Sequence, residues 1–197
     1  MNIEGRTIRL RAVEPGDVDL MYEWENDCDI WPVSGTTEPF SRHQLERFVE
    51  RHQDIVGVLC DGQLRLIIET LLSSKPVGAI DLFEYDPIHR RAGVGILIYE
   101  RSDRGRGYAS EALRAVLDFA LNVVGYRSVT AKHAMENPAS GRVMQKAGMS
   151  MRVGEILPVS TSNGFFNCVV YEIRRPRKKG LFGSPKKPAA FYRIRTS

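Results

Sequence analysis

The chain has 197 residues, of which 43% are hydrophobic and 26% charged, a composition typical of one soluble globular domain. No apolar run approaches the roughly 20 residues of a membrane-spanning helix, and three widely spaced cysteines indicate neither disulfides nor zinc. We therefore expect a cytoplasmic protein without a metal or a membrane partner.

The net charge of +4 is unevenly distributed along the chain. Nine of the 28 basic residues lie from Arg174 onward, where there is no acid, and the remainder carries about −5. This contrast predicts a folded domain over residues 1–174 and a basic, flexible tail over residues 175–197.

The first half of the chain predicts one strand, two helices and three further strands. Residues 6–13 alternate polar and apolar side chains, as a strand does. Asp17 and Ser41 are suitable N-caps for the two helices that follow. The next three strands are expected over residues 63–70, 76–85 and 93–99.

The second half predicts helix, strand, helix and two strands. A stripe of apolar residues predicts a helix over residues 108–124, and Asn137 with Pro138 opens the next helix. Strands are expected over residues 128–133, 149–157 and 165–173, and residues 189–195 could add a short one. The order predicts an α/β (α+β) fold with a mixed, mostly antiparallel sheet of about seven strands and flanking helices.

The segment Gly105-Arg106-Gly107 stands where a strand ends and a helix begins. Glycines permit a tight turn there, and free amide N–H groups at the helix start form a site for a phosphate. Arg104 and Arg106 add positive charge. A simple strand-to-helix turn is the alternative. Neither a P-loop nor a Gly-x-Ser-x-Gly elbow occurs, which excludes the first and disfavours a serine hydrolase.

An acidic block lies near the beginning of the chain. No Lys or Arg occurs between Ala12 and Ser41. The acids in this stretch are Glu14, Asp17, Asp19, Glu23, Glu25, Asp27, Asp29 and Glu38. Their potential would concentrate a cationic ligand, although a solvated helix face is an equally good interpretation.

Three segments in the right order resemble the GNAT superfamily of acetyltransferases: residues 93–99, 104–112 and 137–149. The stretch 81–92 resembles the branch that holds spermidine (diamine) and ribosomal-protein alanine acetyltransferases. The resemblance covers about residues 6–173. It implies the GNAT fold and an acetyl-CoA-dependent N-acetyltransferase, in which a primary amine attacks the thioester directly.

The resemblance also implies which residues bind the donor. The cofactor-binding candidates are Ile96, Leu97, Ile98, Arg104, Gly105, Arg106, Gly107, Tyr108, Ala109, Ser110, Asn137, Ser140 and Lys146. For two of these groups a structural role is an open alternative. Asn137 suits an N-cap, and Ile96 to Ile98 suit a core strand.

The acceptor that the resemblance favours is a small cationic amine such as a polyamine. The substrate-binding candidates are Glu25, Trp31, Glu38, Asp81 and Glu84. Related spermidine enzymes use a tyrosine as the acid at the position of Met144, whose thioether donates no proton. Tyr99, Tyr108 and Glu84 are therefore the candidate catalytic residues, with water as a further substitute.

Three other functions stay open. The loss of tyrosine at Met144 also fits acetylation of a protein N-terminus, as in the alanine acetyltransferases, or a non-catalytic acyl-CoA sensor. A nucleic-acid-binding module would use the tail, but its aromatic residues form no stacking platform, so we expect no nucleic-acid partner. Dimers are common in the family, so a homo-oligomer is expected by analogy alone.

Overall fold

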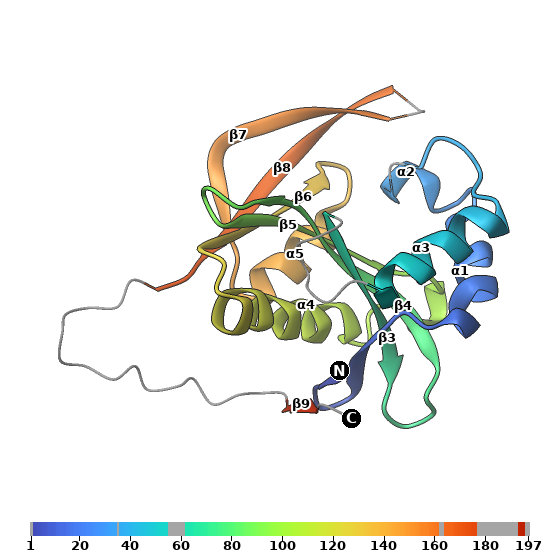
Figure 1. Ribbon diagram of the computed structural model, residues 1–197. Helices are drawn as coiled ribbons and strands as arrows, with labels where there is room; N and C mark the ends of the chain where they lie inside the picture. The colour runs from blue at the N-terminus through green and yellow to red at the C-terminus, as the bar shows by residue number, and fades with distance from the viewer. Residues whose placement is uncertain (1, 35, 55–61, 162–163, 177–192, 196–197) are drawn as a thin grey trace.

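The computed structural model describes residues 2–34, 36–54, 62–161, 164–176 and 193–195. Within these ranges the chain forms a nine-stranded sheet in the order β7-β8-β6-β5-β4-β3-β2-β1-β9 (Figure 1). The strands are β1 (Asn2–Glu4), β2 (Ile8–Ala12), β3 (Gln63–Thr70), β4 (Pro76–Asp86), β5 (Arg91–Ile98), β6 (Ser128–Ala134), β7 (Ser150–Thr161), β8 (Gly164–Arg174) and β9 (Arg193–Arg195). Every neighbouring pair is antiparallel except β5 and β6, which are parallel.

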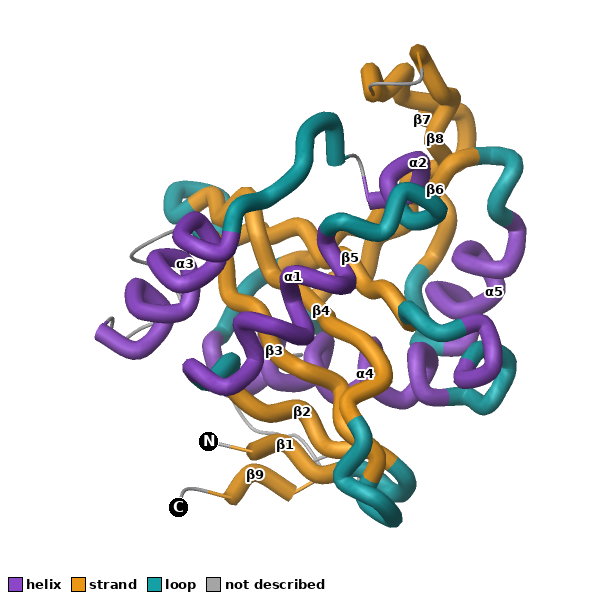
Figure 2. Tube along the Cα trace, turned by 90° about the vertical axis from the view of Figure 1, so that its right-hand side faces the viewer, coloured by secondary structure: helices purple, strands orange, loops and turns teal. Residues whose placement is uncertain are grey.

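Helices cover both faces of the sheet (Figures 1 and 2). They are α1 (Val18–Glu25), α2 (Trp31–Ser34), α3 (Arg42–Asp54), α4 (Tyr108–Asp118) and α5 (Pro138–Lys146). Alternation along the central strands divides the core between the faces. Leu66 and Ile68 pack in the cluster under α4 and α5, while Ile67 between them packs under α1 and α3.

The parallel pair β5–β6 separates partway along its length. Its register runs only from Arg91 with Ser128 to Gly93 with Thr130, but β5 continues to Ile98 and β6 to Ala134. Beyond that point each strand is bonded on its outer edge alone, β5 to β4 and β6 to β8. The two inner edges therefore face each other with backbone groups that no strand pairs, which opens a gap in the middle of the sheet.

The expected fold class is confirmed, but the strand count of about seven was too low. The strand expected over residues 6–13 is confirmed as β2, but it is the second strand of a hairpin whose first strand, β1, was not expected and whose turn is at residues 5–7. Glu111 of α4 stabilises this turn, since its carboxylate accepts bonds from the amides of Arg6 and Thr7 and from the Thr7 hydroxyl. The short strand at the C-terminal end is confirmed as β9, which pairs with β1.

The helices form where expected with small differences, but Asp17 makes no side-chain cap bond to α1, because its carboxylate pairs with Arg11 and accepts from the Glu14 amide at 2.8 Å. Ser41 caps α3 in a capping box with Gln44, whose amide nitrogen donates to the Ser41 hydroxyl at 3.2 Å while its side chain accepts from the Ser41 amide at 2.7 Å. The helix expected over residues 108–124 changes at Phe119 into a π-helix that ends at Val124. The four-residue helix α2 was not expected. Among the described helices, none is long and apolar enough to cross a membrane.

Candidate functional site

The glycine loop before α4 presents backbone rather than side chains. Gly105 and Gly107 have φ of 77° and 91°, values that glycine adopts without strain. No side chain caps α4, and its first bond runs from the Glu111 amide to the Gly107 carbonyl at 3.0 Å. The amides of residues 108–110 precede that bond and have no partner within the helix. Together with the helix dipole they have the geometry that suits an anion, which stays a prediction of the sequence.

Two arginines, Arg104 and Arg106, belong to the loop before α4 and differ in their contacts. Arg104 is used structurally: its Nε and Nη2 donate to the carbonyls of Ile98 and Tyr99 at 2.9 and 2.8 Å. Arg106 is exposed, and its Nε donates to the Ser102 carbonyl at 2.9 Å. The expectation that both arginines face a phosphate thus fits Arg106 better than Arg104.

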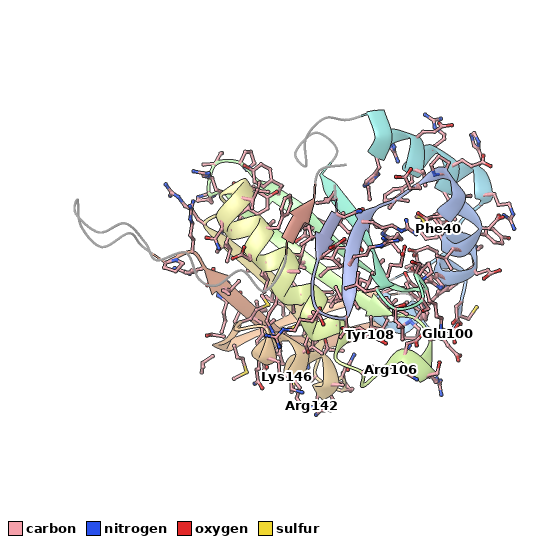
Figure 3. The ribbon with its side chains drawn as sticks, turned by 90° about the horizontal axis from the view of Figure 1, so that it is seen from below. Phe40, Glu100, Arg106, Tyr108, Arg142 and Lys146 are labelled. Carbon is pink, nitrogen blue, oxygen red and sulfur yellow. The ribbon has the colours of Figure 1, made fainter. Side chains whose placement is uncertain are left out.

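The exposed face of α5 adds two more cations near this loop. Arg142 and Lys146 are four residues apart, so they lie on one side of the helix. Figure 3 shows them along the same edge of the molecule as Arg106 and Tyr108. Neither has an ion-pair partner among the described residues. Sequence reasoning named Lys146 and missed Arg142, although the spacing of four residues was a usable signal.

Asn137 has the structural role that was left open. Its side-chain oxygen accepts from the Ser140 amide at 3.2 Å, which makes it the N-cap of α5, and Pro138 follows at the first helical position. This cap fixes the start of α5 beside the end of β6. Ser140 itself is half-buried in the first turn of the helix.

A cavity of about 660 Å³ occupies the gap between β5 and β6. Consecutive residues of both strands line it, namely 93–97 of β5 and 130–132 of β6. Since side chains alternate between faces, consecutive lining residues mean that the cavity passes between the strands. Of the expected β5 contacts, Ile96 and Leu97 line the cavity, whereas Ile98 is buried in the core.

The same cavity brings together four of the five acceptor candidates. Glu25, Glu38, Asp81 and Glu84 all line it, while Trp31 does not; its indole N–H donates to the Glu25 carbonyl at 2.8 Å. Two of the carboxylates are neutralised by Arg65, which pairs with Glu25 and, at 2.8 Å, with Asp81. Sequence reasoning missed Arg65, because nothing in the order of residues shows that α1, β3 and β4 meet here.

Glu38 and Glu84 are the exposed acids of the cavity, and neither has an ion-pair partner within the part of the chain that the structure describes. Glu84 has φ of 51°, a left-handed conformation that is uncommon for glutamate, where the β4–β5 register shifts between Phe83 and Asp86. A bulge of this kind redirects a side chain. Glu84 therefore lies at an irregular point of the sheet that borders the gap.

The candidate acids occupy different environments. Tyr99 is buried and stacks on Trp24, with ring centroids 4.0 Å apart. Burial, together with the nearby charge of Glu25, raises the pKa of Tyr99 well above its ordinary value, which weakens it as an acid. Tyr108 is half-buried against the core under α4. Met144 is 4% exposed and belongs to that core.

A second cavity, of about 520 Å³, shares Tyr99 with this one. The second cavity is lined by Glu23, Trp24, Asp27, Asp29, Ile30, Tyr99, Glu100, Arg101, Ser102 and Arg104. Within the described ranges, no three His, Cys, Asp or Glu side chains gather into a metal site.

The comparison with protein families assigns the class of protein. Residues 7–150 match the model of the acetyltransferase (GNAT) domain. The chain therefore belongs to the GNAT acetyltransferase family and is an N-acetyltransferase. Enzymes of this family use acetyl-CoA as the acetyl donor.

Curated relatives match most of the chain at low identity. The spermidine N(1)-acetyltransferase of Escherichia coli K12 is 21% identical over 165 residues, which cover 83% of each chain. An uncharacterized N-acetyltransferase of Bacillus subtilis strain 168, YoaA, is 24% identical over 181 residues, or 89% of this chain and 98% of the relative.

Solved structures share the fold. A GNAT-family acetyltransferase from Bacillus anthracis has a TM-score of 0.73 at 21% identity, covering 89% of this chain and 99% of its own. The spermidine N-acetyltransferase of Vibrio cholerae in complex with CoA and spermine has a TM-score of 0.72 at 21% identity, with coverage of 85% and 95%.

Proposed function

We propose that this enzyme transfers the acetyl group of acetyl-CoA to a primary amine of a small polyamine. The observation that carries the proposal is the open gap between β5 and β6, with a glycine-cradled helix start on one side and an acid-lined cavity through it. The gap accounts for both substrates, because a long donor and a separate amine must meet at one carbonyl.

The donor half fits the residues that are present. Free amides of residues 108–110 and the adjacent Arg106 suit the pyrophosphate of CoA. The unpaired inner edges of β5 and β6 suit the amide groups of the pantetheine arm, which would complete the strand hydrogen bonds. Arg142 and Lys146 suit the remaining phosphate, the one on the ribose.

The proposed acceptor is a polyamine because carboxylates that line the cavity would attract a cation. Because Arg65 neutralises Glu25 and Asp81 in part, Glu38 and Glu84 are the acids available to a cationic ligand. Two named relatives act on spermidine, which agrees with a polyamine acceptor. Glu84, exposed at the bulge, would take a proton from the ammonium group through water and so leave the amine neutral for attack.

A protein N-terminus is the second candidate acceptor. Lys132 also lines the cavity, and it has no ion-pair partner among the described residues. A cation at this position disfavours a polyamine and favours an acceptor with a carbonyl or carboxylate near its amine, as a peptide has.

Following thiol release from acetyl-CoA with spermidine, spermine, amino acids and an alanine-terminated peptide tests both acceptors. The proposal expects turnover with spermidine or spermine, and preference for the peptide would replace it by the second candidate.

The variant Glu38→Gln tests the role of charge in acceptor binding. It should raise the KM for the polyamine about two- to fivefold and leave the KM for acetyl-CoA unchanged. Glu50→Gln on the exposed face of α3, outside the cavity lining, is the matched control.

A further inference from the structure

His133 near the end of β6 has one ring nitrogen without a partner. Its Nδ1 lies 2.7 Å from the Ala134 carbonyl, so this nitrogen carries a hydrogen and donates it. Its Nε2 is buried and has no hydrogen-bond partner in the described structure. A buried polar atom of this kind costs free energy unless a ligand, a water or a function accounts for it.

The position of His133 places it beside the gap. Thr130 is the last β6 residue in register with β5, opposite Gly93. Continued pairing would set His133 opposite Ile96, so the separation of the strands opens between these two residues. His133 alternates with Lys132 and therefore lies on the face covered by α5, which is the donor side of the gap.

His52 shows that an unpaired nitrogen alone would prove little. Its Nδ1 lies 2.9 Å from the Phe48 carbonyl and its Nε2 is equally buried and unpaired. Neither histidine side chain lines a cavity, but His52 lies on α3, packed against Phe48, whereas His133 lies on β6 beyond the point where this strand separates from β5. Its place on a strand that borders the gap is what distinguishes His133.

The helix above His133 leaves room for this nitrogen. A Cβ atom at Gly141 would lie 2.7 Å from Nε2 of His133 and 3.2 Å from the Tyr171 hydroxyl. These two polar atoms therefore lie within about 6 Å of each other beneath α5. Gln145 donates to the Tyr171 hydroxyl at 3.3 Å, which leaves that hydroxyl its own proton. Gly141 and Gln145 lie within one helical turn of Met144, the position at which related spermidine enzymes have a tyrosine as the acid.

We propose that protonated His133 is the acid that donates a proton to the departing thiolate of CoA. The inference rests on the proposed function. As the amine nitrogen bonds to the carbonyl carbon, the carbon–sulfur bond breaks and its electron pair stays on sulfur. The Nε2 proton of the imidazolium passes to that sulfur, giving the CoA thiol and neutral imidazole. The bond from Nδ1 to the Ala134 carbonyl is kept in both states, so it fixes Nε2 as the nitrogen that gives up the proton.

The residues that face His133 come from α5, β8 and β5, and few of them can change their charge. Tyr171 of β8 approaches its ring, with centroids 5.5 Å apart, and Gly141 and Gln145 of α5 are uncharged. Val169 is its partner on β8 and Ile96 its counterpart on β5. Among these neighbours Tyr171 is thus the titratable one, and it is buried in the core under α5.

The first test uses CoA itself and needs no acceptor. The pKa of the CoA thiol is measured by thiolate absorbance in the complex with the wild type and with His133→Asn, whose amide can still donate to the Ala134 carbonyl. We expect an imidazolium beside the sulfur to lower the thiol pKa in the wild type, and about tenfold less thiolate at neutral pH in the variant. Equal thiol pKa values in the two complexes would refute the inference.

The second test is kinetic. His133→Asn should lower kcat at least tenfold with little change in the KM for acetyl-CoA, and the fall of kcat at alkaline pH should disappear. His52→Asn should leave kcat and its pH profile unchanged. If His133→Asn does not fold, Gly141→Ala, which crowds Nε2 without removing it, should produce the same loss of kcat.

The outcomes separate the two proposals. A wild type that binds no CoA overturns the proposed function as well as the role of His133. A wild type that binds CoA and acetylates an amine, with His133→Asn unchanged in kcat, pH profile and thiol pKa, overturns the role of His133 alone.

Discussion

The two sides of the gap between β5 and β6 offer different kinds of groups to the proposed donor and acceptor. On the proposed donor side the groups are backbone amides, glycines and exposed cations that belong to two short segments. On the acceptor side, side chains from α1, β3 and β4 form a network of charges around Arg65. The first kind of site depends on backbone conformation, whereas the second depends on which charged side chains the fold brings together.

Removing the central cation of the acceptor side should have the largest effect. Arg65 is 14% exposed, and burial alone would lower its pKa, but Asp81 and Glu25 outweigh burial and hold the pKa above its usual value. Arg65→Met leaves two half-buried carboxylates without a partner and should lower the free energy of unfolding by about 3 to 5 kcal/mol. Urea denaturation measures this loss.

The exposed Arg101 provides the control, since its side chain is 84% exposed and lies 3.5 Å from Asp29. Arg101→Ala should change stability by less than about 0.5 kcal/mol. Adding Glu25→Gln and Asp81→Asn to Arg65→Met should restore most of the loss. Failure to restore it would mean that packing rather than charge compensation is what Arg65 contributes.

A change in the glycine loop should break the donor side without touching the acceptor side. Gly107→Glu puts a carboxylate where phosphates are expected and forces a side chain into φ of 91°. CoA affinity should fall about a hundredfold or more by calorimetry, in line with a lost charge-assisted anion site. Gly154, with φ of 80° and open space around it, is the matched control. Gly154→Glu carries similar strain and should leave CoA affinity unchanged.

The anchor between α4 and the β1–β2 turn should give a smaller, pH-dependent effect. Burial alone would raise the pKa of Glu111, but the bonds from Thr7 and from the amide of Arg6 outweigh it and lower that pKa. Because the folded-state pKa is depressed, this stabilisation is present above the unfolded value near 4.5 and is lost as pH falls through the folded value.

Glu111→Gln should therefore cost about 1 to 2 kcal/mol near neutral pH and progressively less below pH 4.5. Denaturation at a series of pH values measures the difference from the wild type. Exposed Glu136 supplies the control, as Glu136→Gln should cost little at any pH. A difference that stays constant down to the lowest pH would contradict the assigned bonds.

The smallest effect is expected on the exposed face of α5. Arg142→Ala with Lys146→Ala should weaken CoA binding about fivefold, or about 1 kcal/mol, and should leave the binding of dephospho-CoA unchanged. The effect should shrink as salt is raised, because both side chains are exposed. An equal loss for both ligands would assign the two cations to the pyrophosphate instead.

Features formed by residues close together in the sequence could be predicted, whereas features formed by distant residues could not. Gly105, Gly107, Asn137 and Pro138 act on their own neighbours, so turn and cap chemistry predicted the loop before α4 and the start of α5 correctly. Arg65 lies 40 positions from Glu25 and 16 from Asp81, and its ion pairs with them required the fold. The hairpin at residues 5–7 was missed for the same reason, since Glu111 holds it across 105 positions.

The amino-acid sequence by itself indicated the class of fold, the glycine turn before α4, the N-cap of α5 and the surplus of carboxylates near the beginning of the chain. These follow from local propensities and residue chemistry. The tertiary structure decided that β5 and β6 separate, that Arg65 neutralises two of those carboxylates and that His133 borders the gap beneath Gly141. Such features depend on contacts between distant segments, which packing and strand register fix and no local pattern encodes.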